Sequence, residues 1–522
     1  MLYTLTPLSG CQVRLGTTRD NPGNSYESHS MLVTWLVFTS LGLSWFILGF
    51  RDLGMFAPAM VLGLTALVWT LAGAVRRSGD PLNPLTVLIA VSLARFGLQA
   101  LLIWINPTPD VDLYRAMRLT ATDWQFGLAL ALLGTLSVVA GWLLIGNRIP
   151  RREKSHLQVS PESRIPAVVT MMLGAVALVF FVARNATLGD VVTQGTFRST
   201  QIQVGTGPLF YLGLLLVPGS IVLSAHLLGR HRSVLFAISP TIFVFACFFV
   251  LGGRVRAIVA VLAALLLVWH TRRGSNQRPR APWKRLVLWV TITLPMLVVL
   301  ANVGSLYRGG EGLAAFGESI ATTDEYLEGA FFVDIGHLHS LAGATKFGPG
   351  ELHGITFLGV MSWPLSEIIK VPGRSSGVFI IDELVGRAER PYGLHATLMG
   401  DAYLNFGIAG VFPICAALGA SMRVLHQRFR HGQISTPMYA LMYLSALRLF
   451  AESIDKWGES LFLILSTYLL FRLSALMFRS PSTRTWSPGL RPKPPSELRG
   501  SGSVQNPGSG GTVLLDDPEI TF

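Results

Sequence analysis

Cysteine and charge are both scarce in this sequence. Its 522 residues include three cysteines, and Cys11, Cys247 and Cys415 show no paired spacing, which supports neither a disulfide framework nor a thiolate metal site. Charged residues make up 14% of the chain and hydrophobic residues 51%, with a mean hydropathy of +0.50. A soluble globular protein of this length would have too little polar surface with such a composition. The composition therefore indicates a protein whose solvent is a lipid bilayer.

Acidic residues are fewer than basic ones, 29 against 42, which gives a net charge of +13. No soluble face gathers the basic residues, so a nucleic-acid partner is not expected. His337 and His339 are two residues apart, and two ligands do not make a metal site, so no metal or other cofactor is expected. Residues 1–30 are polar and lack the pattern of a cleavable signal. Because Met31 begins the first apolar run directly, it is our candidate for the true start of translation.

Long apolar runs are what the sequence has in abundance. Each run is close to the ~20 residues that cross about 30 Å of hydrocarbon as a helix. The sequence thus predicts an all-α, polytopic integral membrane protein of about 12 transmembrane helices. The predicted spans are 31–50, 55–75, 83–105, 124–146, 166–183, 208–229, 233–251, 255–270, 286–303, 402–422, 437–453 and 459–478.

The basic residues predict which side of the membrane each loop faces. With both termini in the cytoplasm, the inner loops and tails hold roughly 25 Lys and Arg residues and the short outer loops about 8, the asymmetry that the positive-inside rule describes. An even number of spans agrees with this topology. Binding to anionic lipid of the inner leaflet is an expected by-product of the basic loops.

One connection is much longer than the others, and long ordered loops are usually functional. It is extracytoplasmic in this topology, and its apolar stretch Ile355–Pro372 is too short to span, which predicts an interfacial or re-entrant segment. A tail rich in Pro, Ser and Gly follows the last span and predicts cytoplasmic disorder. The predicted parts are a polar leader (1–30), nine helices (31–303), the large extracytoplasmic loop (304–401), three helices (402–478) and the tail (479–522).

A very short turn, Gly252-Gly253-Arg254-Val255-Arg256, precedes the eighth predicted span on the outer side. There the free N–H groups of a helix start would meet two guanidiniums beside glycines, an arrangement suited to a phosphate or diphosphate. The alternative is that both arginines snorkel to lipid head groups. Against it, arginine on the outer side runs counter to the positive-inside bias.

Other arginines are candidates for the same anion or for structural pairing. Arg198 precedes Gly205-Thr206-Gly207-Pro208 in an outer loop, where the glycines and proline alternatively only break the chain between helices. Arg308 lies in the large loop. Arg95 falls near the middle of a span, where a charge requires a cavity or a partner. Arg448 lies nearer a span end, from which it can snorkel.

A motif closes the large loop and opens the tenth predicted span. His395 precedes Gly400-Asp401-Ala402-Tyr403-Leu404-Asn405-Phe406-Gly407-Ile408-Ala409-Gly410. In structural terms, Asp401 is a carboxylate near a helix start, and Gly407 and Gly410 are helix-packing positions.

The same motif is similar to the G-E-x-Y-x-N-F-G-x-x-G segment of bacterial O-antigen polymerases, also called oligosaccharide repeat unit polymerases, with Asp401 in place of the usual Glu. Gly252-Gly253-Arg254-x-x-x-Ile258 resembles the G-S/G-R-x-x-x-L element that these polymerases share with O-antigen ligases. With the span count and the single large late loop, the resemblance covers roughly residues 31–478.

The resemblance implies a metal-independent glycosyltransferase of the GT-C type in a bacterial cytoplasmic membrane, acting at its outer face. It would polymerise undecaprenyl-pyrophosphate-linked repeat units into an O-antigen, capsule or exopolysaccharide, and a chain-length regulator is a further candidate partner. Such chemistry needs cations for the departing pyrophosphate and a base for the acceptor hydroxyl. Our candidate cations are Arg198, Arg254, Arg256 and Arg308, and our candidate bases are His395 and Asp401.

Two other functions fit many of the same features. An O-antigen ligase, which transfers glycan to lipid A-core, would share the Gly-Gly-Arg element and the large loop, although His395 matches its expected late-loop histidine only loosely. A flippase or other secondary transporter would also have about twelve spans, but transporters usually show internal repeats and midplane polar sites. The sequence shows no such repeat and only Arg95 as a strong midplane charge.

Overall fold

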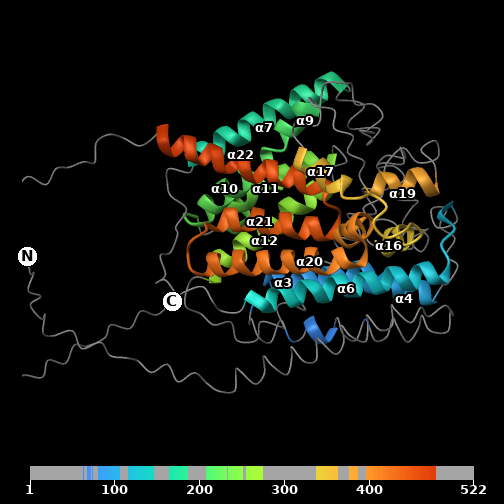
Figure 1. Cartoon of the computed structure of the whole chain (residues 1–522). Coiled ribbons are helices and arrows are strands. Elements are labelled where there is room, and N and C mark those ends of the chain that lie inside the picture. The colour runs from blue at the N-terminus through green and yellow to red at the C-terminus, as the bar shows by residue number, and fades with distance from the viewer. Residues whose placement is uncertain are drawn as a thin grey trace, which may run out of the picture. The chain divides into compact units, whose positions relative to one another are not determined.

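The computed structural model describes residues 63, 68–71, 73, 80, 82–105, 116–145, 164–185, 207–231, 233–250, 254–273, 337–362, 376–385 and 396–477. Every regular element in these residues is a helix, as the sequence predicts. The helices belong to one compact unit, Met1–Leu476 (Figure 1). The second unit, Met477–Phe522, lies outside the described residues apart from its first residue.

The described helices range from short to long, and we call α16, α17 and α19 the short helices. The short helices α16, α17 and α19 gather at one end of the long helices (Figure 1). In chain order the elements are α3 (Pro84–Ser92), the π-helix η2 (Leu93–Gly97), α4 (Leu98–Ile105), α6 (Ala121–Ile145), α7 (Arg164–Asn185), α9 (Gly207–Gly213), α10 (Leu216–Leu228), α11 (Val234–Val250), α12 (Arg254–Arg273), α16 (Leu338–Ala344), α17 (Ile355–Ser362), α19 (Ser376–Leu384), α20 (Thr397–Arg430), α21 (Thr436–Ala451) and α22 (Asp455–Met477).

In the described part of the chain, five stretches of helix are long and apolar enough to cross a membrane, which indicates a helical membrane protein. They correspond to the predicted spans 83–105, 124–146, 166–183, 208–229 and 402–422. Shorter apolar helices occupy the predicted spans 233–251, 255–270 and 459–478, and α21 occupies 437–453. The predicted spans 31–50 and 286–303, and most of 55–75, lie outside the described residues, as do 1–30 and 479–522. The five stretches are Pro84–Ile105, Ala121–Ile145, Arg164–Asn185, Leu209–Leu228 and Thr397–Arg430.

One face of α7 is apolar and exposed, as expected of a helix that borders lipid. Val168, Met172, Val176 and Val179 recur at intervals of three or four residues, and each is exposed. Residues with this spacing lie along one side of a helix. In a bilayer this side would contact acyl chains rather than water.

Local sequence explains how the helices begin. The side-chain oxygen of Asn83 accepts a hydrogen bond from the N–H of Leu85 at 3.0 Å, and Pro84 takes the first position of α3, where its missing N–H is not needed. Before α6, the N–H of Thr120 donates to Asp123 at 2.7 Å while the N–H of Asp123 donates to the Thr120 hydroxyl at 3.3 Å. These reciprocal bonds satisfy N–H groups that a helix start leaves free.

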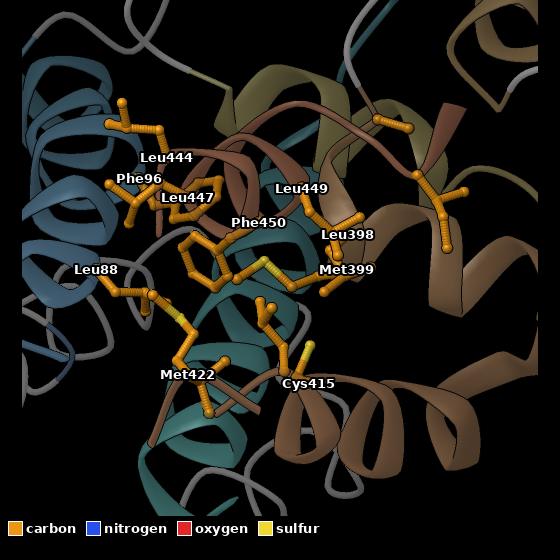
Figure 2. Packing of buried hydrophobic residues seen from close by; sticks show 14 of the residues in the cluster. Leu88, Phe96, Leu398, Met399, Cys415, Met422, Leu444, Leu447, Leu449 and Phe450 are labelled. Atoms are coloured by element: carbon orange, nitrogen blue, oxygen red, sulfur yellow. The ribbon is translucent and has the colours of Figure 1, made fainter. Parts of the chain in front are cut away.

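Apolar side chains from three helical segments meet in the core. Figure 2 shows Phe450 of α21 beside Met399 of α20, with Phe96 of η2 on its other side. The rings of Phe96 and Phe450 meet edge to face at 6.5 Å between centroids, a favoured geometry for aromatic pairs. All three side chains are fully buried or nearly so.

Close helix packing positions α20 against α6 through glycines. A Cβ atom added at Gly419 of α20 would meet the backbone oxygen of Val138, and one added at Gly141 of α6 would meet the backbone oxygen of Ala416. Small residues allow two helix backbones to approach in this way. This packing holds the start of α20 at the end of the bundle where the short helices lie.

We expect Gly419→Ala to destabilise the protein by about 1 to 3 kcal/mol, because its methyl group would push α6 and α20 apart. Gly229→Ala is the matched control, since the nearest atom to its added Cβ lies at 3.5 Å. Thermal unfolding of both purified variants in detergent measures the effect. Equal unfolding midpoints for the two variants would contradict the described packing.

Candidate functional site

Six charged side chains from five parts of the chain lie near one another at the end of the bundle that holds the short helices. They come from η2, α12, α20, α21 and the segment that continues into α22. We call them the polar cluster: Arg95, Arg256, Asp401, Arg448, Glu452 and Glu459.

The carboxylate of Glu459 bridges two guanidiniums. Arg256 donates from Nε to Oε1 at 3.0 Å and from Nη2 to Oε2 at 3.2 Å, and Arg448 donates from Nη2 to the same Oε2 at 3.1 Å. The side chain of Glu459 is 8% exposed, that of Arg448 11% and that of Arg256 25%. The Cζ atom of Arg256 also lies 4.6 Å from the ring centre of Phe210, a cation–π contact. These contacts join α12, α21 and α22.

Arg448 and Arg95 neutralise the end of α21. Arg448 donates from Nε to Oε2 of Glu452 at 2.8 Å, one helical turn further on. Arg95 donates from Nη1 to the carbonyl of Ala451, the last residue of α21, at 3.0 Å. The last carbonyls of a helix lack partners within it and carry partial negative charge, so a cation is favoured there. Arg95 therefore has a structural partner, one of the two roles considered from its midspan position.

The π-helix η2 connects this cluster to the start of α16. Its residue Arg95 offers its backbone carbonyl to the N–H of His337 at 3.1 Å. Gln99 of the following helix accepts from the N–H of Leu338 at 2.6 Å and hydrogen-bonds Nδ1 of His339 at 3.2 Å. Wide π-type turns occur frequently at functional sites. The described residues contain no group of three or more side chains suited to a metal ion.

The helix α20 is interrupted at Gly407, within the motif. Its φ of 68° and ψ of −167° are not helical, a conformation that glycine adopts readily. The interruption frees carbonyls that a continuous helix would use. Those of Tyr403 and Leu404 instead accept from the N–H groups of Gly350 at 3.1 Å and Leu352 at 2.8 Å. The motif thus docks part of the large predicted loop onto α20.

Side chains of the motif complete this docking. The hydroxyl of Tyr403 donates to the carbonyl of Phe347 at 3.2 Å. Asn405 accepts from the N–H of Thr356 at 3.3 Å, and its amide donates back to a carbonyl of its own helix at 2.7 Å. The ring of Phe406 lies 5.1 Å from that of Phe357.

Two motif residues at the start of α20 have packing and positioning contacts. A Cβ atom at Gly400 would lie 3.3 Å from the side chain of Leu341 in α16. Asp401 is fully buried and accepts from the N–H of Ile454 at 2.6 Å, while the N–H of Thr397 donates to the carbonyl of Glu452 at 2.5 Å. Both bonds tie the start of α20 to the turn between α21 and α22. This geometry accounts for Asp401 as a positioning residue, and its role as a base stays a prediction.

The structure brings together some of the predicted site residues. Arg256 lies in the polar cluster, and Arg254 begins α12 two residues earlier, at the same end of the helix. The predicted residues Arg198, Gly252, Gly253, Arg308 and His395 lie outside the described part of the chain.

The sequence did not indicate Glu452 or Glu459, and for Arg448 it predicted only a position from which the side chain can snorkel. In the structure Arg448 is the central cation of the polar cluster. The spacing of Arg448 and Glu452, four residues on one helix, was a local signal for their pairing. The partnership of Glu459 with Arg256, 203 residues away, had no local signal.

Comparison with known proteins found no relative of this chain. A scan against protein-family models found no match, and searches of curated proteins and of solved structures found no similar protein.

We expect Arg448→Met to destabilise the protein by about 3 to 5 kcal/mol, because it leaves two buried carboxylates with less positive charge nearby. Arg472→Met is the control, since Arg472 is exposed and its described contacts are with Tyr468 of its own helix. Thermal and chemical unfolding in detergent compares them. A loss below about 1 kcal/mol for Arg448→Met, as for surface ion pairs, would show that the buried network does not hold the helices together.

Proposed function

We propose that this protein is a membrane glycosyltransferase that polymerises undecaprenyl-pyrophosphate-linked oligosaccharide repeat units into a surface polysaccharide. In this proposal it has about 12 transmembrane helices in a GT-C-like arrangement. It acts at the outer face of a bacterial cytoplasmic membrane, with both termini in the cytoplasm. The proposal rests on the sequence resemblance and on the arginines at one end of the bundle.

The observation that carries the proposal is the convergence of Arg256 and Arg448 near the start of α12, the helix whose first residue is Arg254. Arginine is permanently charged, and its planar fork matches two oxygens of a phosphate. The N-terminus of α12 adds free N–H groups of favourable polarity. The segment that docks on the Gly407 interruption belongs to the predicted large loop and lies at the same end. In this proposal a glycan acceptor approaches at that end.

The proposed reaction transfers the growing glycan from its lipid carrier. The acceptor hydroxyl oxygen on a new lipid-linked unit forms a bond to the anomeric carbon of the donor. The bond from that carbon to the phosphate oxygen breaks, and the polyprenyl diphosphate leaves with the electron pair. The hydroxyl proton passes to a base, for which the sequence nominates His395 and Asp401. Because Asp401 is buried against Ile454, we favour His395 for this step.

Stabilisation of the leaving diphosphate is the main contribution that we assign to the protein. A diphosphate leaves readily once its developing charge is balanced, and preorganised donors lower the barrier without reorganising. Positioning of donor and acceptor contributes further. The arginines are therefore more central to the proposal than the base.

We expect that Arg254→Ala combined with Arg256→Ala abolishes long polymer, because the leaving diphosphate loses its planar cations. Arg254→Lys should rescue poorly, since an ammonium lacks the fork. Gel analysis of surface glycans from a deletion strain that carries each variant gives the result, with immunoblotting for protein in the membrane. Arg472→Ala is the control. Normal chain length in the double variant would overturn the assignment of these arginines to diphosphate.

The orientation of the bundle has its own test. Arg423, Arg428 and Arg430 lie at the end of α20 that is opposite the polar cluster, so the positive-inside rule directs the cluster outward. In a variant that lacks the native cysteines, we expect Glu351→Cys to react with a membrane-impermeant maleimide on intact cells and His431→Cys to react only after lysis. The reverse pattern would place the cluster in the cytosol and remove its access to an outer-face substrate.

A further inference from the structure

Glu459 lies where an external anion would have to bind. Its carboxylate receives two parallel N–H bonds from Arg256 and one from Arg448. A guanidinium offers the same two donors to a phosphate as to a carboxylate. A diphosphate that engages both arginines in the same way must therefore take the place of Glu459.

We propose that Glu459 is an internal competitor of the lipid diphosphate, which occupies the arginine fork in the unliganded protein and leaves it when the diphosphate binds. This inference rests on the proposed function, because it concerns the regulation of the same site. Glu459 acts as a positioning residue and holds both guanidiniums apart from lipid head groups until the carrier arrives.

The pairing gives a physical reason for such a competitor. Oε2 of Glu459 is 3.2 Å from Nη2 of Arg256 and 3.1 Å from Nη2 of Arg448. Two guanidiniums that converge on one oxygen repel each other, and in surroundings of low dielectric constant this repulsion is large without an anion between them. A resting carboxylate keeps the two cations at the separation that a shared anion requires.

The exposure of the two arginines, and the contacts that they keep without Glu459, indicate how a diphosphate replaces the carboxylate. Arg256 is the most exposed member of the bridge, at 25%, so an incoming diphosphate meets it first. Arg448 retains Glu452 at 2.8 Å when Glu459 leaves, so its charge stays balanced. The phosphate oxygens outnumber those of a carboxylate, which favours the diphosphate in the exchange.

Glu459→Gln tests the inference directly. The amide keeps the shape but loses the charge, and the diphosphate no longer has to displace charge-assisted hydrogen bonds. We expect the purified full-length variant in detergent to bind farnesyl diphosphate about tenfold more tightly than the wild-type protein, measured by isothermal titration calorimetry. Glu351→Gln, the same change at an exposed acid at the same end, should leave the affinity unchanged. The affinity for farnesol, which has the same lipid chain without the diphosphate, gives the contribution of the lipid chain to binding.

The possible results separate the inference from the proposed function. Tighter binding in Glu459→Gln but not in Glu351→Gln supports the inference that Glu459 competes with the diphosphate. A purely structural role of Glu459 would weaken binding or leave it unchanged. If the wild-type protein binds farnesyl diphosphate through Arg256, as shown by its loss in Arg256→Ala, but Glu459→Gln binds no tighter, the competitor is wrong and the proposed function stands. If neither protein distinguishes farnesyl diphosphate from farnesol, both are wrong.

A second variant covers the case in which Glu459→Gln does not fold. Glu459→Asp keeps the negative charge for Arg448, but its shorter side chain does not reach both arginines with the same geometry. We expect a smaller tightening, of about threefold. Wild-type or weaker affinity in a folded Glu459→Asp protein would overturn the inference.

Discussion

Charges within an apolar helix bundle must be balanced by other charges or by backbone dipoles, and this constraint organises the end of the protein that holds the polar cluster. Removing an ion from water costs several kcal/mol, which only close partners offset. Glu459 offsets it for Arg256 and Arg448, and the last carbonyl of α21 does so for Arg95. Because each partner comes from a different segment, satisfying the charges also fixes where α12, α21, α22 and η2 meet. The same contacts therefore balance the buried charges and determine how these helices are arranged.

Periodic apolar runs were sufficient to predict the helices, because a span of hydrocarbon dictates both their composition and their length. Nine predicted spans correspond to described helices. The departures arise where backbone geometry depends on tertiary contacts. The π-helix around Arg95 and the interruption at Gly407 both supply carbonyls to segments more than fifty residues away. No local sequence pattern predicts that a backbone carbonyl will bond to such a distant segment. The helix α20 also begins at Thr397 rather than at 402, since its first turn is completed by the turn after α21.

Only part of the candidate site was predictable from the sequence. Arg256 was identified because arginine beside glycine in an outer turn departs from the usual charge bias. Its acidic partner lies 203 residues away and had no such signal. The motif from Gly400 to Gly410 shows the converse. It was easy to recognise, yet the contacts of Tyr403, Asn405 and Asp401 hold backbone segments in place. A recognisable motif near a site therefore does not identify which of its residues touch a substrate.

The carboxylate of Glu459 between two arginines bears on how the proposed site would select a lipid-linked diphosphate. Open arginines at a membrane surface would be occupied by the phosphates of ordinary lipid head groups, which are far more abundant than any carrier. A carboxylate already in the fork raises the affinity that a ligand needs to enter. A monoester or diester phosphate offers less charge than a diphosphate and gains less from the exchange. Under this proposal, competition from Glu459 would convert a general affinity for phosphate into a preference for diphosphate, at the cost of weaker binding to every ligand.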